Sequence, residues 1–113
     1  MSIRLLGTGS ADGWPNPFCT CASCAAARAV GEVRGQTSAL VDSFLLDCGP
    51  ETLRNAERLG ISLADVRHVL LTHDHPDHTA PAFLLYRSWV TSAAEPLDVV
   101  GPASVVASAR QWL

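Results

Sequence analysis

The stretch Val69-Leu70-Leu71-Thr72-His73-Asp74-His75-Pro76-Asp77-His78 is the most informative part of the sequence. Its apolar start belongs to a strand expected over residues 68–72, and a continuous apolar run of this kind is typical of a strand buried on both faces. A loop that holds three of the chain's four histidines follows at once. Because α/β proteins place their chemistry in loops at the ends of buried strands, the stretch predicts a functional site at a sheet edge.

The side chains of this loop are of the kinds that bind metals, since zinc, manganese and iron accept imidazole and carboxylate ligands. His73 and His75 are two residues apart, so in an extended loop both rings can point to one side and bind one ion. Asp77 and His78 follow a proline that turns the chain, which can aim them at a second ion. Two ions about 3.5–4 Å apart share a bridging hydroxide that attacks phosphoester or acyl substrates. The alternative is a polar surface turn that happens to hold three histidines.

Strands and helices are expected on both sides of the loop. Short apolar runs predict strands, and alanine-rich or proline-initiated stretches predict helices. Strands are expected over residues 3–7, 37–41, 44–46, 68–72 and 97–100, and helices over 21–30, 50–59, 81–90 and from 102 onward. In the helix over 81–90, the residues expected in the core are Leu84, Leu85, Trp89 and Val90. Strands that then alternate with helices predict a mixed sheet covered by helices.

Composition excludes several classes of protein. The chain has 113 residues, of which 48% are hydrophobic and 17% charged, so it is not intrinsically disordered. Its net charge is −3 and it has no lysine, so no basic patch for non-specific nucleic-acid or membrane binding is expected. The sequence has neither a secretory leader nor an apolar run long enough for a membrane span. We therefore expect a cytoplasmic protein with reduced thiols.

A second cluster of possible ligands is Cys19-x-Cys21-x-x-Cys24, which places three thiols within six residues. Thiolates at these spacings can occupy three corners of a tetrahedral zinc and leave the fourth ligand to come from elsewhere. We expect a structural zinc here, with the three sulfurs within about 4 Å of one another. The alternative is three small buried thiols around the start of a helix. A disulfide is disfavoured in a reducing compartment.

The motif His73-x-His75-x-Asp77-His78 after an apolar strand resembles the metal-binding motif of the metallo-β-lactamase fold superfamily of hydrolases. Residues 6–9, Leu-Gly-Thr-Gly, resemble the opening strand and turn of its phosphodiesterase branch. Residues 45–49, Leu-Leu-Asp-Cys-Gly, resemble the Asp-x-Gly element that precedes the motif. The resemblance implies an αββα sandwich. Residues 1–113 would form its front half, a mixed sheet with helices on one face, as the N-terminal part of one domain.

The same resemblance implies roles for single residues. His73 and His75 would hold the first metal, and Asp77 and His78 the second, with Asp77 as the candidate catalytic residue. Asp47 would steady the metal loop, the alternative being an ordinary turn aspartate. Members of the superfamily add a third histidine, a bridging aspartate and a final histidine downstream, whereas no histidine follows His78. We therefore expect a fragment or a degenerate chain, and no catalysis by these residues alone.

A narrower resemblance links the first turn, Pro15, the cysteine cluster and Ala27-Arg28 to the cyclic-phosphate phosphodiesterases of phosphonate breakdown. It implies a hydrolase of a small phosphodiester, either cyclic or open, with two divalent ions (zinc or manganese) and one structural zinc. Residues 47–52 also resemble the tRNA 3′-end processing endonucleases of this fold, which is the first alternative. A non-catalytic zinc-binding half-domain is the second. The expected partner is a small phosphoester substrate, and an exposed inner sheet face would also favour association with a second copy of the chain.

Overall fold

The computed structural model describes residues 1–90 and 95–112. Along the chain the elements are β1 (Ile3–Gly7), α1 (Ala22–Val30), β2 (Ser38–Val41), β3 (Phe44–Leu46), α2 (Thr52–Arg58), β4 (His68–Leu70), α3 (Ala82–Ser88), β5 (Asp98–Val100) and α4 (Ala103–Arg110). These are the elements that the sequence predicted, with bounds that differ by a residue or two. No helix in the described ranges is long and apolar enough to cross a membrane.

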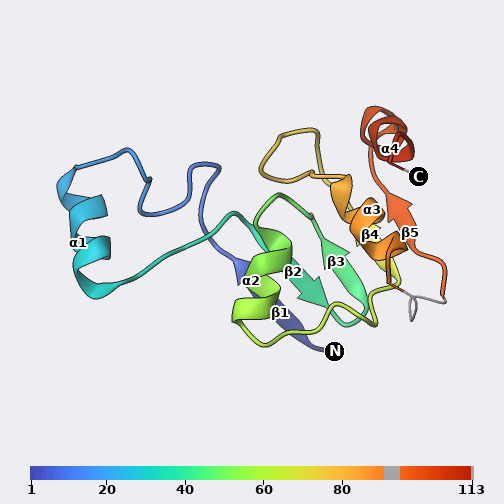
Figure 1. Ribbon diagram of the computed structural model, residues 1–113, viewed down its shortest axis with the longest axis horizontal. Coiled ribbons are helices and arrows are strands. Elements are labelled where there is room, and N and C mark those ends of the chain that lie inside the picture. The colour runs from blue at the N-terminus through green and yellow to red at the C-terminus, as the bar shows by residue number, and fades with distance from the viewer. Residues whose placement is uncertain (91–94, 113) are drawn as a thin grey trace.

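The five strands form one mixed sheet in the order β1-β2-β3-β4-β5 (Figure 1). The pairs β1–β2 and β2–β3 are antiparallel, and the pairs β3–β4 and β4–β5 are parallel. A two-residue turn joins β2 to β3, and its first residue, Asp42, has φ 51°. Aspartate tolerates this left-handed conformation better than most residues, which explains the tight hairpin. The mixed sheet expected from the sequence is thereby confirmed.

One face of the sheet is covered by helices. Leu40, Leu45 and Val69 are cross-strand partners in a single row, and all three are buried. The same core includes side chains from three helices, namely Ala56 of α2, Phe83 and Leu84 of α3, and Val105 and Ala109 of α4. Figure 1 shows α2 lying across β1 and β2, and α3 beside β4. Helices on one face of a mixed sheet are what the resemblance implied.

The opposite face of the sheet is open. Successive cross-strand partners form the central row of this face, which consists of Leu5, Ala39, Leu46, Leu70 and Val100. The end members are largely exposed, with Leu5 at 62%. The expectation that β4 is buried on both faces is therefore wrong, because Val69 is 1% exposed while Leu70 is only half-buried. Among the described residues, helices cover one face only.

The end of α3 also differs from the prediction. Leu84 is buried and Leu85 is half-buried, but Trp89 is 68% exposed and Val90 is exposed. The helix ends at Ser88, so the last two apolar residues lie beyond its final turn and no longer follow its buried side. Helical spacing predicts a common face only for as long as the helix continues.

Residues 8–34 form an arm that carries α1 away from the sheet (Figure 1). Isolated bridges between Gly9 and Gln36 and between Trp14 and Arg34 close the base of the arm. The Arg34 guanidinium also lies 5.9 Å from the centre of the Trp14 ring. Helix α1 ends at Gly31, whose φ of 69° suits glycine at a helix C-terminus. The arm carries the short alanine-rich helix predicted from the sequence.

Candidate metal centres

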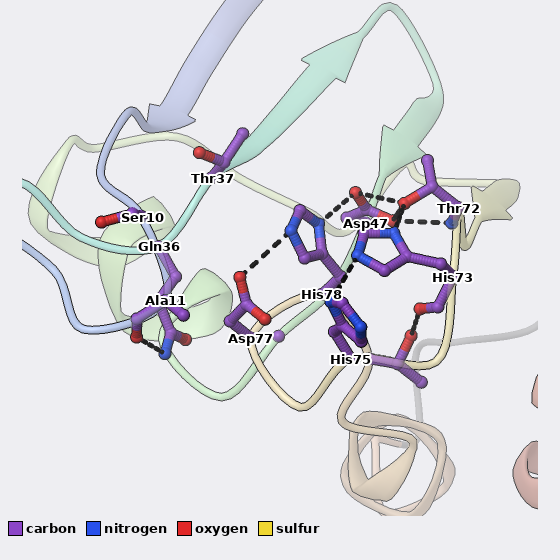
Figure 2. Close-up of polar contacts among 12 residues, drawn as sticks. Ser10, Ala11, Gln36, Thr37, Asp47, Thr72, His73, His75, Asp77 and His78 are labelled. Atoms are coloured by element: carbon purple, nitrogen blue, oxygen red, sulfur yellow. Dashed lines mark hydrogen bonds and ion pairs between the residues drawn. The ribbon is translucent and has the colours of Figure 1, made fainter.

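The histidine loop leaves the sheet at the carboxyl end of β4. Asp47 follows the neighbouring strand β3, which runs parallel to β4. Parallel strands bring their carboxyl ends to the same edge, so Asp47 lies beside the loop although 25 residues separate it from Thr72. Figure 2 shows Asp47, Thr72 and the three loop histidines around one point.

Asp47 is buried and accepts hydrogen bonds from both sides of the loop. The backbone N–H of Thr72 donates to Oδ1 at 2.8 Å, and the Thr72 hydroxyl reaches the carboxylate at 2.9 and 3.0 Å. Nδ1 of His78 lies 2.7 Å from Oδ2. The φ of Asp47 is 61°, a conformation that aspartate adopts more readily than most residues. The carboxylate thus joins the start of the loop to its end, as expected of a residue that steadies it.

The first histidine pair is close enough to share one ion. Nε2 of His73 lies 3.1 Å from Nδ1 of His75. Two nitrogens each about 2.1 Å from one ion, at tetrahedral or octahedral angles, are separated by about 3.0–3.4 Å. The two rings meet edge to face. His73 and His75 therefore point to the same side of the loop, and their geometry fits a shared ion.

The second pair consists of Asp77 and His78. The carboxylate Oδ2 of Asp77 is 3.1 Å from Nε2 of His78, and Asp77 is buried. The rings of His73 and His78 are 4.2 Å apart, which places the two pairs next to each other. All four side chains predicted as ligands are thus brought together at one edge of the sheet, from a loop that spans only six residues.

Hydrogen positions around the loop follow from its contacts. The single hydroxyl hydrogen of Thr72 is directed at Asp47, so the 2.8 Å contact between Thr72 Oγ1 and His73 Nδ1 needs its hydrogen from the histidine. His73 then carries its lone pair on Nε2. His78 donates from Nδ1 to Asp47, and its Nε2 faces the Asp77 carboxylate at 3.1 Å. In each pair the Nε2 atom thus faces the other ligand, where an ion would bind once that nitrogen presents its lone pair.

Contacts that the sequence reasoning missed fix the backbone of the loop. Thr79 donates its hydroxyl to the carbonyl of His73 at 3.0 Å, and the Cys48 N–H donates to the carbonyl of His78 at 3.0 Å. Gly49 packs so closely that a Cβ there would overlap the carbonyl oxygen of Asp77. The glycine after Asp47 and Cys48 was visible as a motif element, but its contact with the loop was not.

The cysteine cluster lies in the arm, at the start of α1 and away from the histidine loop. The sulfurs of Cys19, Cys21 and Cys24 all lie within 4.8 Å of one another, so the three thiols converge on one point. Cys21 caps α1 by accepting from the N–H of Cys24, and Cys24 lies in the first helical turn. The Cys24 N–H, together with the Cys19 thiol, lowers the pKa of Cys21 to about 7.

Three convergent thiols fit a single zinc, because a soft thiolate donor set matches the metal and small movements bring the sulfurs to tetrahedral spacing. Within the described residues the group contains no fourth candidate ligand. Cys24 is buried, but it is not among the residues of the core under the sheet. The fourth cysteine, Cys48, is part of that core, and burial raises its pKa to about 12.

Comparison with known proteins gives one family and several relatives. A family model for the metallo-beta-lactamase superfamily matches residues 31–102. Ribonuclease Z from Mycobacterium marinum is 41% identical to this chain over 106 residues, covering 90% of the chain and 33% of that protein. The chain thus spans about a third of the length of the curated relatives it matches.

Solved structures show the same fold. Zn(2+)-bound PqqB from Methylobacterium extorquens aligns with a TM-score of 0.75 and 23% identity, covering 96% of this chain and 40% of that one. The short form of human tRNase Z aligns with a TM-score of 0.69 and 22% identity, over 98% and 39% of the two chains. A diphosphatase from the PhnP family aligns with a TM-score of 0.54 and 30% identity, over 67% and 30%.

Proposed function

The chain belongs to the metallo-beta-lactamase superfamily, and on that basis we propose that it supplies part of the active site of a metal-dependent phosphodiesterase. The observation that carries the proposal is the set of contacts around Asp47, which orients the rings so that Nε2 of His73 faces His75 and Nε2 of His78 faces Asp77. Two divalent ions, zinc or manganese, would activate water at this site and offset the charge of a phosphoryl group. His73 and His75 would hold the first ion, and Asp77 and His78 the second.

The chain's own residues arrange this site before any metal arrives. Asp47 orients His78 directly and His73 through Thr72, so both rings are held by one buried carboxylate. Such partners behind metal-binding histidines fix the ring and raise its basicity. An ion shared by His73 and His75 would require the ring hydrogen of His75 to lie on Nε2, so that Nδ1 presents its lone pair. Asp77, which is buried with its Oδ2 3.1 Å from Nε2 of His78, is the proposed catalytic residue.

The proposed substrate is a small phosphodiester. A net charge of −3 and the lack of lysine disfavour a long polyanion as substrate. The 30% identity with a diphosphatase from the PhnP family also supports a small phosphate compound. Cleavage of tRNA precursors is the second candidate, and the 41% identity with a ribonuclease Z favours it. Both activities break phosphodiester bonds and need the same loop.

We further propose that the cysteine cluster holds a structural zinc and that residues 1–113 are part of one larger domain in a cytoplasmic enzyme. The sheet's open face and the two ligands per ion support the larger domain, as does the greater length of the relatives. Metal sites normally use three or more protein ligands, so further ligands would come from chain beyond these residues. Residues 1–113 alone are accordingly expected to be inactive.

The test is hydrolysis of bis(p-nitrophenyl) phosphate, in the presence of zinc or manganese, by the full chain, meaning the whole protein of which residues 1–113 are proposed to be a part. His75→Ala and Asp77→Asn should each reduce kcat/KM by a factor of about 100 or more. His68→Ala is the matched control, since His68 lies on the open face of the sheet and outside the loop. Equal activity of His75→Ala and the parent chain would overturn the proposal. So would activity of residues 1–113 alone that His75→Ala abolishes.

A competition experiment separates the two substrate classes. The full chain is assayed on small cyclic phosphodiesters of ribose and on a tRNA precursor with a 3′ extension, under the same metal and salt conditions. Preference for the small cyclic esters supports the leading proposal. Cleavage of the precursor at its 3′ end, with little turnover of the small esters, would replace it with the endonuclease.

A further inference from the structure

Arg28 makes two short contacts that connect α1 to the loop before it. Its Nη1 donates to the backbone carbonyl of Cys19 at 2.6 Å, and its Nη2 donates to the carbonyl of Asn16 at 2.6 Å. Arg28 lies in the last turn of α1. One guanidinium therefore reaches back along the helix and binds both ends of the turn formed by residues 16–19.

Cys19 lies at the end of this turn. Unlike the other two clustered cysteines, it belongs neither to α1 nor to its N-cap. Cys21 is the N-cap of α1 and Cys24 lies in its first turn, so the helix fixes their spacing. Cys19 precedes the helix and sits at the end of a turn closed by its N–H donating to the Asn16 carbonyl at 3.0 Å. The position of its sulfur relative to the other two depends on what ties this turn to α1.

We propose that Arg28 is a positioning residue for a three-thiolate metal site, which it completes by holding Cys19 against the start of α1. The inference rests on the proposed zinc at the cysteine cluster and adds the residue that organises it. Arg28 contacts no sulfur in the structure, so its effect passes through the backbone of residues 16–19.

The chemistry of the side chain suits this role. Arginine presents its donors in a rigid planar fork, so a single side chain can bind two carbonyls in one fixed geometry. Hydrogen bonds from a charged donor are stronger than those between neutral groups. The positive charge also lies close to a group of thiols that become negative when they bind metal. Lysine keeps the charge but has no fork, so Arg28→Lys separates the two contributions.

Other contacts also tie the loop to α1, but they do not hold the Cys19 backbone. Trp14 Nε1 donates to Ser23 Oγ at 3.0 Å, which ties an earlier part of the loop to α1. The backbone of Asn16 hydrogen-bonds the Cys24 thiol, which holds the other end of the turn. The N–H of Cys21 points at the Cys19 sulfur at 3.4 Å, which is a weak bond. Residues behind metal ligands typically change metal affinity by a factor of 10–100 when replaced. We expect a loss near the lower end, about 10-fold, because Arg28 is exposed.

The test is Co²⁺ titration of the full chain, in which the sulfur-to-cobalt charge-transfer band reports bound thiolates and ignores the histidine loop. The parent chain should show the intensity of three thiolates per ion. Arg28→Gln should bind about 10-fold more weakly and show the intensity of two thiolates, and Arg28→Lys should fall between the two. Arg58→Gln is the matched control, since Arg58 lies in the last turn of α2 and should leave the band unchanged.

The possible results distinguish the role of Arg28 from the presence of a zinc at the cysteine cluster. If Arg28→Gln matches Arg58→Gln in affinity and intensity, the role of Arg28 is overturned while the zinc proposal stands. If the parent chain shows no charge-transfer band, the zinc proposal itself fails. If Arg28→Gln and Arg28→Lys lose all three thiolates together with helical signal in circular dichroism, Arg28 holds the arm folded rather than placing Cys19, which also overturns the inference.

Discussion

Asp47 and His78 are joined by a 2.7 Å contact between Oδ2 and Nδ1 across 31 residues of sequence. The same carboxylate accepts from the backbone and the hydroxyl of Thr72. One buried side chain directly after β3 therefore sets the orientation of a loop that begins after β4, and the metal affinity of that loop should depend on it.

The first prediction concerns Asp47→Asn. Asparagine tolerates the positive φ and can still accept from Thr72, but its amide cannot accept from His78 Nδ1. Mn²⁺ affinity measured by calorimetry should fall by a factor of about 10–100. Asp65→Asn, an exposed aspartate outside the loop, should bind as the parent chain does. Unchanged affinity in Asp47→Asn would show that the loop does not need this carboxylate.

The second prediction concerns the fit between Gly49 and the loop. In Gly49→Ala the added methyl group would overlap the carbonyl oxygen of Asp77, which is backbone and cannot move alone. The free energy of unfolding in urea should fall by about 1–3 kcal/mol. In Gly35→Ala the nearest obstacle is the side chain of Asn55, which can rotate away, so the loss should be smaller. An equal loss in both variants would argue against a rigid contact between Gly49 and the loop.

A third prediction follows from the thiol chemistry of the arm. The Cys24 N–H and the Cys19 thiol lower the pKa of Cys21 to about 7, so its thiolate forms as pH rises through 7. In the metal-free chain, the rate of Cys21 alkylation by iodoacetamide should be half-maximal near pH 7, measured by peptide mass spectrometry. Cys48, whose pKa burial raises to about 12, should stay unmodified. A Cys21 profile centred near pH 8.5, as for a free cysteine, would contradict this.

The fourth prediction concerns the open face of the sheet. Residues 1–113 expressed alone should self-associate through this apolar surface, which would appear in sedimentation velocity as species larger than a monomer. Leu5→Arg places a charge in its central row and should shift the population towards monomer. Leu59→Arg is the control, because Leu59 is similarly exposed, at 55%, but lies at the end of α2. Equal behaviour of the two variants would mean that association does not use this face.

The sequence predicted the elements because each depends on local signals. Gly31 ends α1, a two-residue turn after Val41 forces a hairpin, and a run of apolar residues marks β4. The burial of a strand is different, because it depends on which other elements pack against the two faces of that strand. That is why burial of β4 on both faces was predicted and only one face is covered, and why Trp89 was placed in the core but lies beyond the end of α3.

The candidate site was predictable as far as ligand identity goes. The spacing of His73, His75, Asp77 and His78 indicated two neighbouring pairs, and the structure brings those pairs together. The hydrogen-bond chain from His73 through Thr72 to Asp47 was not predictable, since it depends on the pairing of β3 with β4. The contacts of Arg28 were not predictable either, because its partners are backbone carbonyl groups, which every residue has.

The central claim is that the loop from His73 to His78 binds divalent metal, and Mn²⁺ titration of the full chain followed by electron paramagnetic resonance tests it most directly. Manganese prefers nitrogen and oxygen ligands to thiolates, so the cysteine cluster does not contribute. We expect at least a 10-fold loss of affinity in His75→Ala and no change in His68→Ala. Equal affinity in His75→Ala, His68→Ala and the parent chain would contradict it.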